Sequence, residues 1–112
     1  MYSKRQNKVG RLIQKELSEI LRQSGNEIHP NTLFTVTVVR LSPDLSVAKA
    51  YISLFTNEDK EKVLENLSNS SKNIRHQLAQ KIRHQVKKIP ELIFYEDDSL
   101  DYADRIDKLL NQ

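Results

Sequence analysis

The histidines of the segment KNIRHQLAQKIRHQVKKIPEL, residues 72–92, are the first candidates for chemistry. His76 and His84 lie in a repeated IRHQ, with six Lys or Arg and no acid before Glu91. In a helix, eight residues rise about 12 Å and turn the second side chain about 80° from the first, too far for two ligands of one metal ion. The third histidine, His29, falls in an expected loop, and the chain has no cysteine. The spacing therefore predicts no metal ligands and no cofactor.

The adjacent carboxylates of Asp97 and Asp98 are the second candidate for chemistry. Neighbouring residues do not face each other on a helix, and Asp is a common helix N-cap. The sequence has no GxSxG, no Walker loop and no dinucleotide fingerprint. Its two glycines, Gly10 and Gly25, give backbone amides little opportunity to approach a nucleotide phosphate. We predict no catalytic residues and expect that the protein is not an enzyme.

Charge distribution is the remaining chemical signal. The net charge is only +3, but residues 1–23 carry six basic side chains against two acids, and residues 72–88 carry six against none. Residues 91–112 reverse this, with seven acids and two basic side chains. Such asymmetry favours a polyanionic partner, with an ordinary solvated helix surface as the alternative. We rank nucleic acid above lipid, because the apolar stripes of so small a domain are needed for its core.

A long amphipathic helix must position the first basic cluster. Apolar residues recur at helical spacing from residue 9 to residue 21, and they fill one face: Val9, Leu12, Ile13, Leu17, Ile20 and Leu21. The opposite face carries Lys4, Lys8, Arg11, Lys15 and Arg22. We expect the helix to end near Ser24-Gly25-Asn26, where Gly suits a left-handed cap. The N-terminus lacks the apolar run of a signal peptide, and no stretch approaches a membrane span, which predicts a soluble cytoplasmic protein.

Two alternating, β-branched segments follow, residues 33–41 and 47–55. In the first, we expect Phe34, Val36 and Val38 on one face and Thr35 and Thr37 on the other. In the second, the expected inner face is Ala48, Ala50, Ile52 and Leu54. The intervening Ser-Pro-Asp-Leu is typical of a turn, so the two segments predict an antiparallel hairpin.

The second basic cluster lies in a helical region, residues 58–89, that is interrupted by SNSSK at 68–72. Ser and Asn favour helix ends over interiors, so we expect two helices or one sharp kink, with Thr56 or Asn57 as the first cap. The later helix carries Ile74, Leu78, Ile82, Val86 and Ile89 on one side and is expected to run to Pro90. Lys72, His76, Arg83 and Lys87 share one polar stripe, and Lys88 lies on another. Arg75 points toward the apolar side, which indicates a structural role.

A short strand over residues 92–95 and a last helix, capped at Asp97, Asp98 or Ser99, complete the pattern. The expected order is α-β-β-α-(kink)-α-β-α, an α+β fold with helices packed on one face of a three-stranded sheet, in a single domain over 1–112. This order is that of the type II KH domain, whose helix pair clamps a nucleic-acid backbone with a basic loop, often GxxG. The chain has no GxxG; its helix junction is Asn69-Ser70-Ser71-Lys72.

Three segments resemble the bacterial ribosome-binding factor A family. VVRLSPDLSVAKAYIS, residues 38–53, is similar to the family's strand, Ser-x-Asp-Leu turn and following strand. IPELIFYEDDSL, residues 89–100, resembles the family's Val-Pro-Glu-Leu-x-Phe-x-x-Asp-x-Ser signature, and Ile74-Arg75 resembles its Ile-Arg pair. The family's Ala-x-Gly kink is replaced here by Ser70-Ser71-Lys72. We expect a short form of the family, without the C-terminal extension seen in some members.

The resemblance implies a KH-like, monomeric factor that binds free small (30S) ribosomal subunits through small-subunit rRNA. It further implies a part in late subunit maturation, including rRNA 5′-end processing, in ribosome biogenesis and cold adaptation, with a ribosome-assembly GTPase implicated in release. The residues we expect to bind RNA are Lys4, Lys8, Arg11, Lys15, Lys72, His76, Arg83, Lys87 and Lys88. The alternative is a protein-interaction module whose acidic C-terminal helix, residues 98–111, docks a basic partner.

Overall fold

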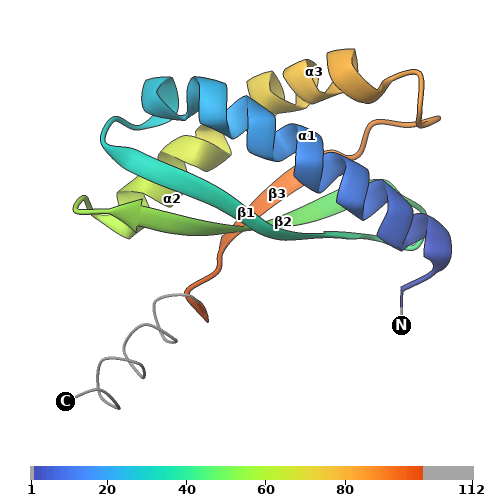
Figure 1. The fold of residues 1–112 in the computed structure, drawn as a ribbon, viewed down its shortest axis with the longest axis horizontal. Helices are drawn as coiled ribbons and strands as arrows, with labels where there is room; N and C mark the ends of the chain where they lie inside the picture. Colours follow the sequence, from blue (N-terminus) through green and yellow to red (C-terminus); the bar gives the residue numbers. More distant parts are fainter. Residues whose placement is uncertain (1, 100–112) are drawn as a thin grey trace.

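The computed structural model describes residues 2–99 (Figure 1). Its elements, in chain order, are α1 (Lys4–Ile28), β1 (Thr32–Leu41), β2 (Val47–Thr56), α2 (Lys60–Asn69), α3 (Ser71–Ile82) and β3 (Glu91–Glu96). This order confirms the expected one as far as the last strand. The final helix expected after Ser99, and with it the acidic helix of the alternative function, lies outside the described residues.

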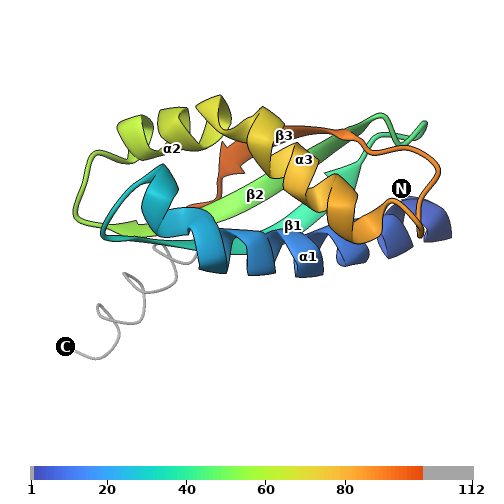
Figure 2. The same cartoon turned by 90° about the horizontal axis from the view of Figure 1, so that it is seen from above.

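Within the described residues, three helices and a three-stranded sheet form two layers, which confirms the predicted α+β fold. The sheet order is β1-β2-β3; β1 and β2 are antiparallel, and β2 and β3 are parallel. Figures 1 and 2 show all three helices on the same face of the sheet, with α1 along β1 and α3 beside α1. The other face of the sheet carries no helix within residues 2–99.

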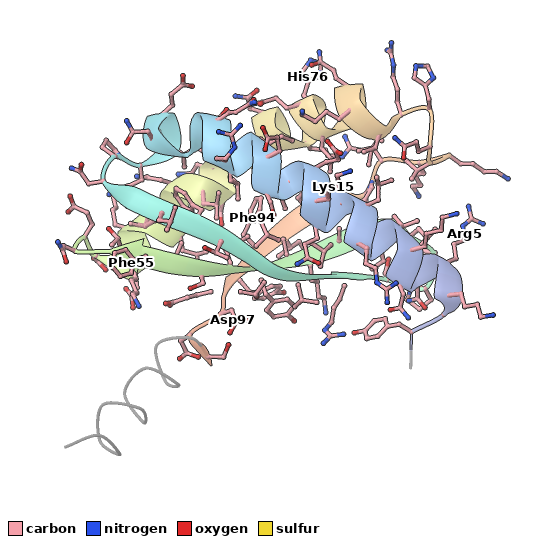
Figure 3. The ribbon with its side chains drawn as sticks, viewed as in Figure 1. Arg5, Lys15, Phe55, His76, Phe94 and Asp97 are labelled. Atoms are coloured by element: carbon pink, nitrogen blue, oxygen red, sulfur yellow. The ribbon has the colours of Figure 1, made fainter. Side chains whose placement is uncertain are left out.

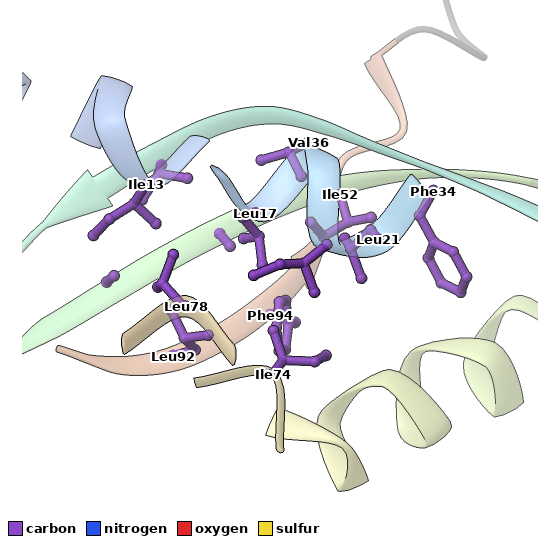
Figure 4. Packing of buried hydrophobic residues seen from close by; sticks show 14 of the residues in the cluster. Ile13, Leu17, Leu21, Phe34, Val36, Ile52, Ile74, Leu78, Leu92 and Phe94 are labelled. Carbon is purple, nitrogen blue, oxygen red and sulfur yellow. The ribbon is translucent and has the colours of Figure 1, made fainter. Parts of the chain in front are cut away.

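The core lies between the sheet and the three helices (Figure 4). Helix α1 contributes Ile13 and Leu17, both fully buried, and α3 contributes Ile74 and Leu78. The inward face of β2 is as expected: Ala48, Ala50, Ile52 and Leu54 are all buried. Small residues at 48 and 50 let the helices lie close to the centre of the sheet. The apolar sides of α1 and α3 are thereby used in the core, which leaves their basic sides in solvent.

Helix α1 is longer than expected, because Gly25 does not end it. The helix continues to Ile28, and among the described glycines there is no positive φ. Gly25 is buried against Phe34, whose ring would lie 3.0 Å from an added Cβ. Close packing with β1, rather than a left-handed cap, therefore explains glycine at this position. At the other end, Ser3 and Gln6 form a capping box that fixes the start of the helix.

A β-bulge in β1 interrupts the alternation of inward and outward side chains that the sequence predicted. The register shifts between Val36 and Val38, so that Val36 pairs with Ile52 and Val38 pairs with Tyr51. Beyond the bulge Val39 and Leu41 are buried, whereas Val38 is only half-buried and does not join the inner face. The extra residue, Thr37, reverses the side on which each later residue of the strand points.

The predicted break between the two later helices is confirmed at Ser70. Its φ of −91° and ψ of 1° end α2, and α3 begins at the next residue. The Ser70 hydroxyl donates to the carbonyl of Asn66, 3.1 Å away. This junction needs no left-handed residue, so Lys72 can stand where the family has glycine without a backbone cost. The N-cap of α2 is Asp59 and not Thr56 or Asn57, since Asp59 accepts from the amide of Glu61.

Helix α3 is shorter than expected and ends at Ile82 rather than near Pro90. Residues 83–90, the connector, turn back toward the sheet, with the amides of Gln85 and Val86 donating to the carbonyl of Ile82. Val86 and Ile89 still pack against the core, and this is why their spacing resembled a continuing helix. Consequently Arg83, Lys87 and Lys88 are not on a helical stripe with Lys72.

Candidate nucleic-acid interface

The outer face of α1 carries the first basic cluster, as the sequence predicted. Lys4, Lys8, Arg11 and Lys15 are all exposed. Ile13 and Leu17 anchor the opposite side of this helix in the core, which sets the direction in which the cations point. Figure 3 shows Lys15 near the middle of α1 and Arg5 near its start. No acidic residue occurs in the chain before Glu16, so this half of the helix has a uniform positive charge.

Ion pairs neutralise the other half of α1. Arg22 binds Glu19 through its guanidinium, with its Nε 3.1 Å from the carboxylate, and this bond lowers the pKa of Glu19. Lys81 of α3 lies 3.9 Å from the carboxylate of Glu16. Within residues 2–99, no acid forms an ion pair with any of the five cations from Lys4 to Lys15. The free positive charge is therefore concentrated in the N-terminal half of α1.

Arg75 holds the connector in place, as its position beside the apolar face suggested. Its Nε donates to the carbonyl of Pro90 at 3.0 Å, and its Nη2 donates to the carbonyl of Ile89 at 2.7 Å. Pro90 is fully buried, and the amide of Glu91 donates to the carbonyl of Ser46. These contacts fix the C-terminal end of the connector. Its basic side chains, Arg83, Lys87 and Lys88, remain exposed.

The connector, the start of α1 and the β1–β2 turn meet at a cleft. The residues that line it are Arg5, Val9, Asp44, Leu45, Gln85, Val86, Lys87 and Lys88. Half-buried Val9, Leu45 and Val86 form its apolar floor, and they pack against the core. Arg5 was missed by the sequence analysis. Its place at the border of the apolar and basic sides of α1 was the signal that could have identified it.

Asp44 is the acidic residue of this cleft. Its carboxylate accepts from the Ser46 hydroxyl at 2.7 Å, from the Ser42 hydroxyl at 2.8 Å and from the Ser46 amide at 3.1 Å. These bonds, with a smaller effect of Lys88, lower the pKa of Asp44 to about 2. The bonds also stabilise a turn in which Leu45 has a φ of 61°. Asp44 is thus an ionised, fixed counter-charge beside Lys88.

Lys72 and His76 lie elsewhere on the surface. Both are exposed on α3, and Figure 3 shows His76 on the outer side of that helix. Lys72 lines a separate hollow with Ser71, Arg75, Glu91 and Leu92. The Nε2 of His76 lies 3.3 Å from Gln80. The structure therefore places these two predicted site residues apart from the cleft that joins α1 to the connector.

The structure suggests one continuous cationic region, which we call the α1–connector surface. Its residues are Lys4, Arg5, Lys8, Arg11, Lys15, Arg83, Lys87 and Lys88. Long, exposed ammonium and guanidinium groups on two elements that meet at a cleft can donate to successive phosphates of one strand. Across residues 2–99 no group of three metal-ligating side chains occurs, and no helix is long and apolar enough to cross a membrane.

Comparison with known proteins identifies the family that this chain resembles. The family model described as Ribosome-binding factor A matches residues 5–110. Ribosome-binding factor A of Cytophaga hutchinsonii is 46% identical over 112 residues, covering 100% of this chain and 84% of that protein. That of Christiangramia forsetii is 45% identical over 105 residues, covering 93% and 80%. The names of these relatives state ribosome binding and no catalytic activity.

Solved structures show the same fold. The crystal structure of ribosome-binding factor A from Thermus thermophilus has a TM-score of 0.68 and 25% identity, covering 85% of this chain and 97% of that chain. A model of the Thermus thermophilus factor, fitted into a cryo-EM map of a complex between the 30S subunit and that factor, has a TM-score of 0.65. It is 28% identical and covers 80% of this chain and 91% of the other.

Proposed function

Since the chain belongs to the ribosome-binding factor A family, we propose that it binds free small (30S) ribosomal subunits through small-subunit rRNA. The Thermus thermophilus relative fitted into a complex with the 30S subunit supports this proposal. The observation that carries it in this chain is the α1–connector surface, where eight cations gather on two elements and only Asp44 opposes them in the cleft. Phosphate contacts of this kind supply most of the affinity of such proteins for RNA.

The factor would act in late maturation of the small subunit, including processing of the rRNA 5′ end. Its contribution is binding rather than catalysis, because its exposed cations can hold an rRNA conformation while other enzymes cut the chain. Release by a ribosome-assembly GTPase and a part in cold adaptation belong to the same proposal. A cytoplasmic location and a monomeric state follow from it, since free subunits mature in the cytoplasm and one copy presents the whole surface.

Co-sedimentation with purified 30S subunits tests the proposal. We expect saturable binding at physiological salt and a log affinity that falls linearly with log salt concentration. Reversing two charges of the connector, Arg83→Glu with Lys87→Glu, should weaken binding and reduce the magnitude of the salt slope by about 2. Both side chains are exposed, so the circular dichroism spectrum should stay native.

The matched control is Lys49→Glu with Lys62→Glu. It makes the same change in net charge, at exposed positions on the helix-free face of the sheet and on α2. We expect its affinity to stay close to that of the unchanged chain. If both double variants lost affinity equally, net charge rather than the α1–connector surface would govern binding. If the unchanged chain did not bind 30S subunits saturably, the proposed function would be wrong.

A further inference from the structure

The helix-free face of the sheet exposes large apolar side chains. The outward residues of the strands are those that alternate with the buried ones, and they include Phe55 at 77% exposure and Leu33 at 62%. These two residues are direct cross-strand partners in the β1–β2 register. Together they form an apolar pair. The pair lies past Ile52, the last residue of β2 that has a partner in β3.

Further large apolar groups lie farther along the same face. Tyr51 of β2 and Tyr95 of β3 are register partners, with their rings stacked at a centroid distance of 5.4 Å. Ile93 follows on β3, with 37% of its surface exposed. The paired residues Thr35 and Ser53 separate Tyr51 from Phe55, which lie about 13 Å apart along β2. The exposed groups therefore form an apolar strip with one polar interruption, and apolar side chains gathered on one exposed face commonly mark a contact surface.

The chain leaves β3 directly over this face. The amide of Asp97 donates to the carbonyl of Ile52 at 2.8 Å, which continues the β2–β3 pairing by one residue. The Thr37 hydroxyl of β1 then donates to the Asp97 carboxylate at 2.6 Å, so the residue reaches across β2. Figure 3 shows Asp97 on the side of the sheet away from the helices. Shortly before the described residues end at Ser99, the chain therefore lies at the exposed face of the sheet and not on its core side.

The sequence beyond Ser99 has the pattern of a segment that covers an apolar face. Residues 100–112 are 13 residues, and as a helix they would extend about 20 Å, enough to cross three strands and the apolar pair. At about 100° per residue one half of such a helix carries all of the larger apolar residues: Leu100, Tyr102, Ala103, Ile106, Leu109 and Leu110. The other half carries four of the five charged residues, Asp101, Asp104, Arg105 and Lys108, and Asp107 falls near the edge of the apolar half.

We propose that residues 100–112 fold as an amphipathic helix on the helix-free face of the sheet and cover Leu33 and Phe55. The segment starts at that face, has the required length, and presents an apolar side that the rest of the fold leaves without a partner. Its charged side then points outward, away from the helices that carry the α1–connector surface. The sheet becomes covered on both faces.

Fluorescence of Phe55→Trp in the full chain tests this proposal, because the natural sequence has no tryptophan. We expect an emission maximum typical of a partly buried indole and slow quenching by acrylamide. Adding Ile106→Asp with Leu110→Asp should move the emission to the red and raise the quenching constant about twofold, since the indole loses its apolar cover. The matched control, Arg105→Gln with Lys108→Gln, changes the net charge equally on the opposite side and should alter neither quantity.

Three results would overturn the proposal. The indole could be fully exposed in the Phe55→Trp chain, or the two double variants could behave alike. Alternatively, protection of the indole from acrylamide could grow with protein concentration and not depend on residues 106 and 110. The last result would show that a second copy covers the strip. The variant His76→Trp, on the outer side of α3, is the fold control: its fluorescence should be the same with and without Ile106→Asp and Leu110→Asp.

Discussion

At the scale of one residue, Arg75 shows that a basic side chain can stabilise the fold rather than bind a ligand. It donates to two consecutive carbonyls, those of Ile89 and Pro90, and so fixes the end of the connector that carries Lys87 and Lys88. The sequence indicated this role, because Arg75 falls beside the apolar side of α3. What the sequence could not give was its partners, since they lie 14 and 15 residues away across a turn that only the folded chain forms.

Replacement of Arg75 by Met should lower the free energy of unfolding by about 1–2 kcal/mol, because two hydrogen bonds from a charged donor are lost. Lys72→Met, which removes an exposed charge one turn earlier, should change it by less than about 0.5 kcal/mol. Urea unfolding measures both. Amide exchange of Glu91, whose N–H binds Ser46, should accelerate only in the Arg75 variant. Equal effects of the two substitutions would show that Arg75 does not anchor the connector.

Asp44 predicts a specific pH dependence. Its pKa is lowered to about 2 in the folded chain by bonds from Ser46 and Ser42, against about 3.9 in an unfolded chain. A lowered folded pKa means that the ionised form stabilises the fold above pH 4, and that this stabilisation is lost as the pH falls through about 2. The stability difference between the unchanged chain and Asp44→Asn should therefore shrink between pH 4 and pH 2.

Urea unfolding at stepped pH measures this difference, and Ser46→Ala provides the internal check. Removing the Ser46 hydroxyl takes away the largest cause of the lowered pKa, so the pH dependence contributed by Asp44 should weaken in that background. A stability difference between the unchanged chain and Asp44→Asn that stays constant from pH 5 to pH 2 would contradict the assignment.

At the scale of elements, α1 and β1 approach each other closely at Gly10. An added Cβ there would lie 2.7 Å from the carbonyl oxygen of Val39, which is backbone and cannot rotate away. Alanine favours a helix by about 1 kcal/mol over glycine, but forcing the helix off the strand costs about 1–3 kcal/mol. We expect Gly10→Ala to destabilise the protein on balance.

Thermal unfolding checks the Gly10 prediction, with Asn7→Ala as its control. Asn7 is exposed on the same helix, so its replacement gains helix propensity without meeting β1, and Tm should stay level or rise. A higher Tm for Gly10→Ala would mean that the helix and strand can separate without loss. Gly10→Ala would also show whether the position of the basic side of α1 depends on the close approach of Gly10 to Val39.

The elements also show where sequence reasoning succeeds and where it ends. Hydrophobic periodicity located the hairpin and the core sides of the helices, and polar residues located the break at Ser70, because these signals are local. The end of α1 depends on Gly25 packing under Phe34, and the end of α3 depends on Val86 folding back onto the core. Both are tertiary contacts between distant segments, and a pattern read along one helix cannot contain them.

The candidate site was predictable to the same degree. The cations of α1 and of residues 83–88 were identified by their lack of acidic neighbours, which is a property of the sequence alone. Their meeting at one cleft, with Arg5 included and Lys72 and His76 left outside, needs the connector to turn back beside α1. That turn is set by Arg75 and buried Pro90, so the shape of the site is a consequence of the fold.

At the scale of the whole molecule, the two faces of the sheet differ in character. The helices cover one face of the sheet (Figure 2). They bury their apolar sides against it, and their outer side carries the α1–connector surface. The other face offers the apolar strip that contains Leu33 and Phe55. A rigid domain with one cationic side can bind rRNA in a single orientation, and that orientation is the central claim to be tested.

Site-specific photo-crosslinking to 30S subunits tests this claim most directly. A photoreactive residue is placed at Arg11 and at Lys87 on the α1–connector surface, and at Lys62 of α2 as the control; all three positions are exposed. We predict crosslinks to small-subunit rRNA from the first two positions, at neighbouring nucleotides, and little rRNA crosslinking from the third. Equal crosslinking from all three positions, or crosslinks to rRNA from Lys62 alone, would contradict the account.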